Sequence, residues 1–251
     1  MRLLPPKPVE RGPRVTIWIS SVGDVPDTHW AKLRAQLGLS ARQRLQQIRS
    51  VAAAREFCLG RALLREALDE LDCGPAEIII GPYGRPELTG ASSLPSFNIA
   101  HSDGLVAVAV TFEGIVGLDV EAIRRDGAFP AIAPLVLQPR EREWLTCQPE
   151  HLRGRAFFGL WTLKEAYAKA QGRGLGMDFT SFGFHLDAPL APPRLELDDE
   201  VSSHSWRFRH IDLHSDFSAA VALCSPQQGP IEVSLRRCVG SGVNGLGLAF
   251  D

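Results

Sequence analysis

The sequence predicts an α+β fold made of two related α/β lobes, and three observations support this. First, 251 residues suffice for one large domain or two of modest size. Second, helical patterns precede strand patterns in each half of the chain. Third, one run recurs between two expected strands, first as His101-Ser-Asp-Gly-Leu-Val-Ala-Val-Ala-Val and later as His214-Ser-Asp-Phe-Ser-Ala-Ala-Val-Ala-Leu. A true repeat would give two lobes related by a pseudo-two-fold axis, with a ligand cleft between them.

The two expected lobes meet near residue 117. We expect an N-terminal lobe at 1–116, a C-terminal lobe at 117–225 and a tail at 226–251 with a mobile, Gly-rich end. Chance similarity of two Ala- and Val-rich strands explains the repeated run equally well. No arginine-rich helix precedes the second copy, so we interpret that copy as structural.

Composition excludes several classes of protein. The chain is 45% hydrophobic and 22% charged with a net charge of −2, as in ordinary globular proteins, which argues against binding dominated by nucleic acid or an anionic membrane. It has no apolar run as long as a membrane helix and no signal-peptide pattern. The five cysteines are scattered without a CxxC pair, which supports neither a zinc site nor a disulfide framework. We therefore expect a cytoplasmic protein with reduced thiols.

In the N-terminal half, β-branched residues, N-cap residues and glycine stops define the expected elements. Strands are expected at 14–22, 77–80, 96–99 and 105–112, and helices at 27–38, after Ser40 and at 52–71. The last of these helices has an apolar stripe near the 3.6-residue period, with most of its arginines off that stripe. The segment 81–86 is a turn-rich loop, and His101–Gly104 is a hairpin turn.

The C-terminal half continues with strands at 115–121, 179–186, 206–213 and 218–223 and helices at 140–144 and 154–171. Within the long helix, Trp161 to Gly172 consists largely of good helix formers and ends at a glycine stop. Glu165 and Lys169 are four residues apart and share a helical face. Taken alone, this spacing favours a surface salt bridge between them.

Three carboxylates indicate a magnesium site. Asp119 and Glu121 lie two residues apart on an apolar strand, so both side chains point to one face of the sheet. Two carboxylates on one face repel each other unless a cation, a proton or an arginine intervenes. Glu165 from the long helix adds a third carboxylate. Such oxygen ligands suit Mg²⁺, which also binds substrate phosphates. A solvent-facing strand surface is the ordinary alternative.

A magnesium site implies a phosphate ester as the bound substrate. The chain also contains basic residues that could contact such a phosphate. They are Arg44, Arg55, Arg61, Arg85, His101 and Lys169. Arginine binds phosphate in a forked geometry, whereas lysine acts as a point charge. No Walker A, Rossmann or GxSxG pattern is present. We therefore expect an enzyme to supply a metal and a base here, with the nucleophile coming from a partner.

At this level of detail the sequence resembles the 4′-phosphopantetheinyl transferases, in particular the larger, two-lobed monomeric (Sfp-like) class. The resemblance rests on five ordered motifs between about residues 40 and 224. They are GRALLREAL at 60–68, GRP at 84–86, FNIAHS at 97–102, VGLDVE at 116–121 and FFGLWTLKEAYAKAQGRGL at 157–175. Membership implies transfer of the phosphopantetheine arm of coenzyme A to a serine of an apo acyl or peptidyl carrier protein, with release of 3′,5′-ADP. It also implies two pseudo-symmetric α/β lobes with the cofactor between them.

The resemblance also assigns roles by motif. Asp119, Glu121 and Glu165 match the Mg²⁺ ligands, and Glu165 is also the candidate base. Lys169 matches a lysine on the phosphates and His101 a histidine near the 3′-phosphate. Arg85 and Arg44 match residues that help to hold the nucleotide, which places the nucleotide contacts mostly in the N-terminal lobe.

Two departures from the family pattern stand out: Ala100 replaces a frequent serine, and the chain after Ser225 finds no counterpart. Two other functions fit the same residues. One is a non-catalytic module that binds a carrier protein or a nucleotide, and the other is a Mg²⁺-dependent nucleotide phosphodiesterase that uses water as its nucleophile.

Overall fold

The computed structural model describes residues 12–81, 84–90, 93–123, 129–173, 176–185, 193–196 and 205–238. The α-helices are α1 (Trp30–Ala35), α2 (Leu39–Gln47), α3 (Val51–Glu70), α4 (Phe129–Val136), α5 (Pro139–Thr146) and α6 (Glu150–Gln171). Short 3₁₀ turns form η1 (Val22–Asp24), η2 (Asp27–His29) and η4 (Phe179–Ser181). No helix in these described ranges is long and apolar enough to cross a membrane.

The strands form two main sheets. The first lobe contains β1 (Arg14–Ser21), β4 (Ser96–Ser102) and β5 (Leu105–Thr111), and the second contains β6 (Ile115–Ala122), β9 (Trp206–His210) and β10 (Phe217–Cys224). A late strand, β11 (Glu232–Arg237), joins the first sheet, whose order is β11-β1-β5-β4, and the second sheet has the order β6-β10-β9. Two small pairs complete the list, β2 (Glu77–Ile80) with β3 (Pro86–Thr89) and β7 (Gly183–His185) with β8 (Arg194–Glu196).

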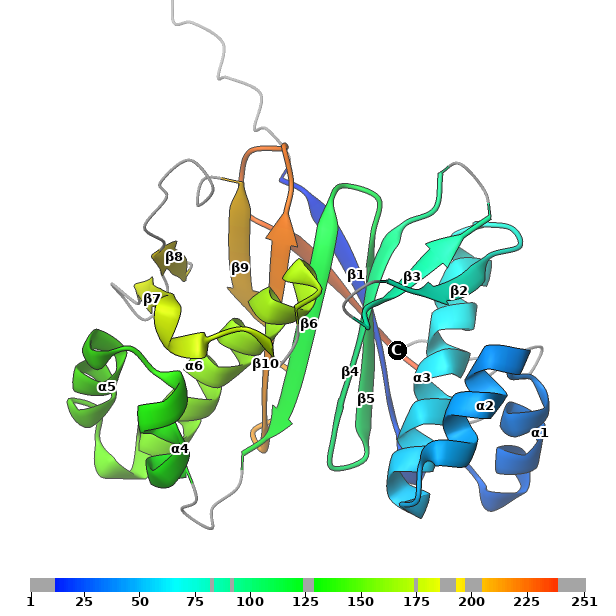
Figure 1. Ribbon diagram of the computed structural model, residues 1–251, viewed down its shortest axis with the longest axis horizontal. Coiled ribbons are helices and arrows are strands. Elements are labelled where there is room, and N and C mark those ends of the chain that lie inside the picture. The colour runs from blue at the N-terminus through cyan, green and yellow to red at the C-terminus, as the bar shows by residue number, and fades with distance from the viewer. Residues whose placement is uncertain are drawn as a thin grey trace, which may run out of the picture.

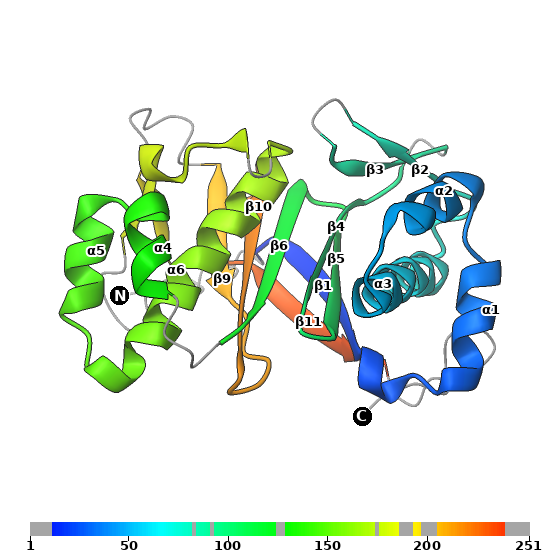
Figure 2. The same ribbon diagram turned by 60° about the horizontal axis from the view of Figure 1, so that its bottom comes forward.

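The described elements form four layers, with α3 and α6 on the outer faces of the two sheets (Figures 1 and 2). Successive side chains of a strand point to opposite faces of the sheet, so alternate residues of each strand pack in different hydrophobic cores. Trp18, Val106 and Val108 pack with the α3 side. Residues of the opposite strand faces form an apolar layer between the two sheets, with Ile17 from the first sheet and Leu118 from the second. A third core lies between α6 and its sheet.

The two lobes repeat one topology, which confirms the predicted α+β architecture. In the first lobe, β5 pairs antiparallel with both β1 and β4. In the second, β10 pairs antiparallel with both β6 and β9. Each lobe places one long helix between its first strand and its final strand pair. The repeated His-Ser-Asp runs at His101 and His214 begin at equivalent places, where β4 leads to β5 and β9 leads to β10.

The lobes are joined along a seam between β4 and β6. The side chains of Ser96, Asn98 and Ser102 accept hydrogen bonds from the backbone N–H groups of Val116, Leu118 and Ala122, at 3.1 Å in each case. Polar side chains of β4 thus replace the backbone carbonyls of a normal sheet. Ala100 occupies the intervening position and is buried in the apolar layer between the sheets. Where the family often has a serine hydroxyl, this chain therefore has a methyl group that packs against apolar side chains.

The expected tail at 226–251 is not irregular throughout, because its first part contains a strand. Glu232–Arg237 forms β11, which pairs parallel with β1 along Arg14–Ile19. The rest of that stretch, from residue 239 onward, lies outside the described residues. The expected boundary at 116/117 falls inside β6. The expected lobe limits and the cofactor cleft between the lobes stay predictions.

Candidate active site

The site is built where α6 lies unusually close to β6, and Gly117 makes this approach possible. A Cβ atom at Gly117 would lie 2.0 Å from the carbonyl oxygen of Ala166 and 2.7 Å from the nitrogen of Ala170, which no side chain could occupy. The helix ends at Gly172, whose φ of 74° is in the left-handed region that glycine favours. The close contact brings side chains of α6 against Asp119 and Glu121, the next residues on the same strand face.

Asp119 and Lys169 form an ion pair between strand and helix. The Lys169 Nζ atom donates to the Asp119 Oδ1 atom at 2.5 Å. The Asp119 side chain is only 4% exposed, and its Oδ2 atom is buried without a hydrogen-bond partner. Burial raises the pKa of Asp119 although the Lys169 ammonium opposes the shift. Burial alone would lower the pKa of Lys169, but the Asp119 carboxylate, helped by Glu165 and Glu121, raises it.

Glu165 faces the strand carboxylates, as the sequence predicts. It is buried, and this burial raises the pKa of Glu165 to about 7, with further repulsion from Asp119 and Glu121 and partial relief from Lys169. The surface salt bridge that the i, i+4 spacing alone would favour, and that the expected magnesium site argues against, is not formed, because the bond that Lys169 makes is to Asp119. A carboxyl group with a pKa near neutrality exists in both protonation states at physiological pH, which is the condition for accepting and returning a proton.

Glu121 is held by two residues that the sequence patterns did not single out. The Ser102 hydroxyl donates to the Glu121 Oε2 atom at 2.9 Å, and the Trp161 indole N–H donates to the Oε1 atom at 3.2 Å. The Trp161 ring in turn stacks on Phe179, with ring centroids 5.6 Å apart. Trp161 stands four residues before Glu165 in the long helix, and this spacing is the one signal that could have identified it.

The three carboxylates fit a magnesium ion through their chemistry more than through their present geometry. In the described parts of the chain, no three His, Cys, Asp or Glu side chains converge tightly enough to hold a metal as they stand. Lys169 takes one oxygen of Asp119, and Ser102 and Trp161 take those of Glu121. The unpartnered Oδ2 atom of Asp119 is nevertheless a buried oxygen that lacks a cation or donor. That atom and the neighbouring carboxylates make an oxygen-rich site of the type Mg²⁺ prefers.

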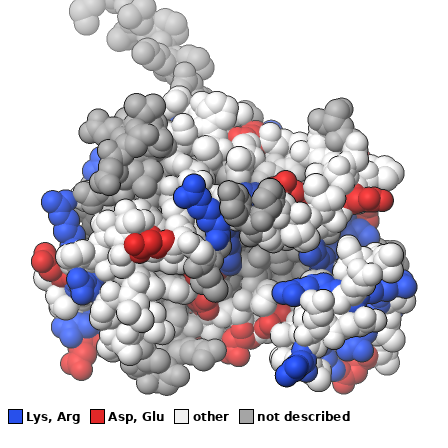
Figure 3. All heavy atoms as spheres, viewed as in Figure 1, with Lys and Arg blue, Asp and Glu red and all other residues white. Residues whose placement is uncertain are grey.

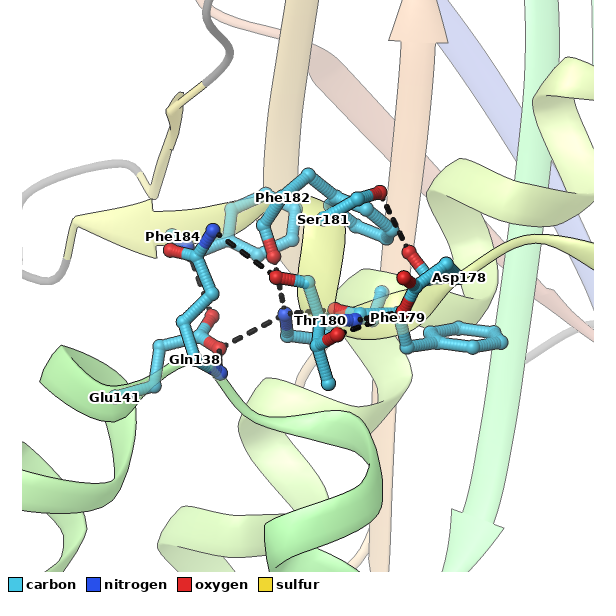
Figure 4. A network of polar contacts seen from close by, with 9 residues as sticks. Gln138, Glu141, Asp178, Phe179, Thr180, Ser181, Phe182 and Phe184 are labelled. Atoms are coloured by element: carbon cyan, nitrogen blue, oxygen red, sulfur yellow. Dashed lines mark hydrogen bonds and ion pairs between the residues drawn. The ribbon is translucent and has the colours of Figure 1, made fainter.

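A second buried ion pair, between Lys164 and Glu141, holds α6 against α5 and the segment around η4, and Figure 4 labels Glu141 and the η4 residues of this network. Lys164 Nζ lies 2.8 Å from Glu141 Oε2 and donates to the carbonyl oxygens of Phe179 and Phe182 at 2.8 and 2.5 Å. The other oxygen of Glu141 accepts the Phe184 N–H at 2.9 Å. Because Lys164 precedes Glu165, this network fixes α5 and the segment around η4 against the helix that carries the candidate base.

His101 lies near the end of β4, next to Ser102 in sequence but on the opposite face of the strand. Its Nδ1 atom lies 3.1 Å from the Glu56 Oε2 atom of α3. The imidazole is about half exposed, at 46%. Glu56 is a further residue that the sequence analysis missed, because nothing in the pattern of α3 distinguishes it from its arginine-rich surroundings. The structure thus places His101 on the α3 side of the first sheet, whereas Ser102 contacts Glu121 on the other side.

Arg85 and Arg44 occupy different places. Arg85 is partly buried and donates to the carbonyl oxygens of Ala170 and Val116 and to the Ser96 hydroxyl. These bonds tie the end of α6 to the seam between the lobes, and burial lowers the pKa of Arg85. Arg44 is exposed on α2, where it donates to Gln47 at 3.1 Å. Figure 3 shows Lys and Arg side chains gathered over the half that contains α1 to α3. The nucleotide contacts of both arginines stay predictions.

Comparison with known proteins identifies the family. The family model described as the 4′-phosphopantetheinyl transferase superfamily matches residues 115–224. The 4′-phosphopantetheinyl transferase AcpT of Salmonella typhi is 31% identical over 139 residues, which cover 55% of this chain and 69% of AcpT. The chain belongs to the 4′-phosphopantetheinyl transferase superfamily. The family and the enzyme class predicted from the sequence are thereby confirmed.

A further relative and two solved structures are also similar to this chain. The 4′-phosphopantetheinyl transferase HetI of Nostoc is 31% identical over 157 residues, or 61% of this chain and 66% of HetI. Among solved structures, the holo-(acyl-carrier-protein) synthase of Bacillus anthracis in complex with CoA (3′,5′-ADP) is 19% identical with a TM-score of 0.39, and covers 45% of this chain and 96% of the synthase. The holo-[acyl-carrier-protein] synthase of Thermotoga maritima is 24% identical with a TM-score of 0.38, and covers 47% of this chain and 66% of the synthase.

The region matched by the superfamily model coincides with one structural repeat. It begins at Ile115, the first residue of β6, and ends at Cys224, the last residue of β10. It therefore contains Asp119, Glu121, Glu165 and Lys169. The residues expected to hold the nucleotide, Arg44, Arg85 and His101, belong to the other repeat.

Proposed function

We propose that this transferase moves the 4′-phosphopantetheine arm of coenzyme A onto a serine of an apo acyl or peptidyl carrier protein and releases 3′,5′-ADP. Membership of the superfamily supports this reaction. The structural observation that carries the proposal is the buried group of Asp119, Glu165 and Lys169, with one unpartnered carboxylate oxygen, at the contact of α6 with β6.

Asp119, Glu121 and Glu165 would hold a Mg²⁺ ion in this group. The ion, when bound, neutralises charge on the pyrophosphate of coenzyme A and polarises the phosphorus that is attacked. Ser102 and Trp161 orient the carboxylate of Glu121 from both of its oxygens. Such outer partners fix the direction of a ligand before the metal arrives.

Glu165 acts as the general base in the proposed reaction. With a pKa of about 7, a substantial share of its carboxyl groups is ionised at neutral pH. The ionised form accepts the proton of the carrier serine, directly or through one water. The serine oxygen then attacks the phosphorus that bears the pantetheine arm, and the bond to 3′,5′-ADP breaks. Lys169 contributes positive charge next to the transferring phosphoryl group.

The N-terminal lobe binds the nucleotide in this proposal. His101 contacts the 3′-phosphate, and Arg85 and Arg44 help to hold the rest of the nucleotide. Arg85 would need to exchange one of its present bonds for a nucleotide oxygen. Its Nε atom has no hydrogen-bond partner but is buried, so the side chain would have to move before this donor could reach a nucleotide oxygen.

The decisive experiment mixes the protein with coenzyme A, Mg²⁺ and a panel of apo acyl and peptidyl carriers. Mass spectrometry should show addition of phosphopantetheine to at least one carrier. Glu165→Gln should lose most of this activity while circular dichroism shows an intact fold. Glu150→Gln, at the exposed start of the same helix, is the matched control and should stay active. A near-normal rate for Glu165→Gln would refute the role as base and ligand.

The alternative functions give different results in the same assay. Rapid release of 3′,5′-ADP from coenzyme A without any carrier protein would indicate a phosphodiesterase. Binding of coenzyme A without turnover on any carrier would indicate a non-catalytic module. For the nucleotide side, His101→Ala should weaken binding of coenzyme A more than that of 3′-dephospho-coenzyme A. Equal losses would contradict the contact with the 3′-phosphate.

A further inference from the structure

Glu56 is a buried carboxylate on α3 for which the proposed reaction has no role so far. The residue is 9% exposed and lies on the side of α3 that faces the first sheet. Acidic side chains are rarely buried unless they are paired, because an unpaired buried charge is costly. Both oxygens of Glu56 are in fact used, and both partners belong to the hairpin that carries His101.

The first oxygen secures the backbone of the hairpin. Glu56 Oε1 accepts the N–H of Gly104 at 2.8 Å. Asp103 and Gly104 have φ angles of 49° and 83°, as a tight hairpin turn requires. The carbonyl of Gly104 also accepts the N–H of Val22 at 2.8 Å. Because Ser102 bonds to Glu121 on the opposite side, the turn is held from both lobes.

The second oxygen selects one nitrogen of the His101 ring. Glu56 Oε2 lies 3.1 Å from Nδ1, and an ionised carboxylate only accepts hydrogen bonds, so Nδ1 must carry the proton. The other nitrogen, Nε2, is then the one left for a ligand. It can donate to a phosphate only if it is protonated as well, and both nitrogens are donors only in the imidazolium form.

We propose that Glu56 is the positioning residue for His101: it fixes the hairpin and holds the imidazole with Nδ1 inward, so that Nε2 is the nitrogen presented to the 3′-phosphate of coenzyme A. The phosphate part rests on the proposed function, whereas the orientation of the ring does not. Glu56 therefore determines how strongly the enzyme distinguishes coenzyme A from its 3′-dephospho form.

The first experiment observes the ring itself, without substrate. Nitrogen-15 NMR, with the His101 signals identified from His101→Ala, is recorded at alkaline pH, where a free imidazole is neutral. The intact protein should show a proton on Nδ1. Glu56→Gln keeps an oxygen for Gly104 and offers an N–H to Nδ1, so the proton should move to Nε2. Asp69→Asn, on the exposed face of the same helix, makes the same charge change and should leave the signals unaltered. An unchanged His101 signal in Glu56→Gln would overturn the proposal.

The second experiment is a double-mutant cycle on the transfer reaction. Glu56→Gln should raise KM for coenzyme A on the order of tenfold, the loss expected for one charge-assisted hydrogen bond. It should leave kcat and KM for 3′-dephospho-coenzyme A nearly unaltered. In the His101→Ala background, the effect of Glu56→Gln on KM should vanish, because its route to the ligand is gone. An equal effect in both backgrounds would show that Glu56 acts through the fold alone and would overturn the proposal.

The two experiments separate this inference from the proposed function. If His101→Ala weakens both nucleotides equally, the contact with the 3′-phosphate is refuted, and the NMR result still decides whether Glu56 orients the ring. If the ring signals report Nδ1 protonation and the cycle shows coupling, both statements hold. If neither the parent protein nor any variant catalyses the transfer, while the His101 ring signals show a proton on Nδ1, only the proposed function would be refuted.

Discussion

The ammonium nitrogen of Lys169 lies 2.5 Å from the Oδ1 atom of Asp119 and connects α6 with β6 across the candidate site. The lysine is 28% exposed at its side chain, whereas the aspartate is almost fully buried. The structure therefore places a protein cation beside the same carboxylate that we propose as a metal ligand. Several measurable consequences follow from this pair and its surroundings.

Replacing Lys169 with Met should destabilise the fold by about 3 kcal/mol, because it leaves Asp119 as a buried, unpaired charge. The double variant Asp119→Asn with Lys169→Met removes that charge as well and should recover most of the loss. Urea unfolding in the presence of EDTA measures both effects. Arg55→Met provides the control, because its pair with Asp27 is exposed and should contribute less than about 1 kcal/mol. Equal losses in the single and double variants would contradict this account.

The raised pKa of Glu165 predicts that the metal-free protein loses stability as the pH rises. Its ordinary pKa of 4.5 describes the unfolded chain, and about 7 describes the folded one, so the folded state binds more protons between these values. The stabilisation is fully present below pH 4.5 and lost as the pH passes 7, a change of about 3 kcal/mol.

Unfolding of the EDTA-treated protein at pH 5 and pH 8 tests this dependence. Glu165→Gln resembles the protonated acid at every pH. It should therefore exceed the stability of the parent protein by less than about 1 kcal/mol at pH 5 and by about 3 kcal/mol at pH 8. Parent and variant curves that run parallel between these pH values would show that Glu165 is not the titrating group.

Gly117→Ala should damage both fold and activity. The added methyl group would collide with the backbone of α6 at Ala166 and Ala170, and overpacking of this kind costs about 1–3 kcal/mol. The strand that carries Asp119 would then move away from the helix that carries Glu165. Gly154→Ala is the matched control, since its methyl group meets only Phe129 at 3.7 Å and should stabilise α6 by about 0.5–1 kcal/mol. Full activity of Gly117→Ala would contradict the close approach.

Trp161→Phe should leave stability nearly intact but change the response to Mg²⁺. The phenyl ring still stacks on Phe179, whereas the hydrogen bond to Glu121 is lost. A carboxylate ligand that is less well oriented should raise the Mg²⁺ concentration required for half-maximal activity by about tenfold or more. The measurement is a Mg²⁺ titration of the transfer rate at saturating coenzyme A. An unaltered titration would mean that Ser102 alone orients Glu121.

The carboxylate face could be predicted from the sequence because it depends on local periodicity. The two-residue period of β6 places Asp119 and Glu121 together, and the matched family motifs add Glu165 from α6. The partner of Lys169 could not be predicted in the same way. A helical neighbour, Glu165, and a strand residue far away in sequence were both within possible reach. The depth of the approach at Gly117 decides between them.

Other differences arise where the local pattern is weak or misleading. The two prolines of α4 favour a loop, yet the segment is helical: Pro130 lies in the first turn, which tolerates a proline, whereas Pro134 lies inside the helix. The strand β11 was missed although Val233 and Leu235 alternate with polar residues, because the alternation is short and the strand is mostly exposed. Arg85 follows the family pattern for a nucleotide contact, but three protein acceptors lie within its reach in the packed seam.

The pairing of β11 with β1 also constrains how the protein can be made. Arg14 and Glu232 are neighbours in the sheet but 218 positions apart in the chain, so the ribosome releases one long before the other. At about 5–20 residues per second, the outer edge of β1 waits on the order of 10 to 40 s for its partner. During this time the edge of β1 in the nascent first lobe has unpaired backbone N–H and C=O groups, which can pair with another chain. Co-translational folding therefore cannot finish the lobes one after the other, and chaperone dependence should be concentrated on the half that is synthesised first.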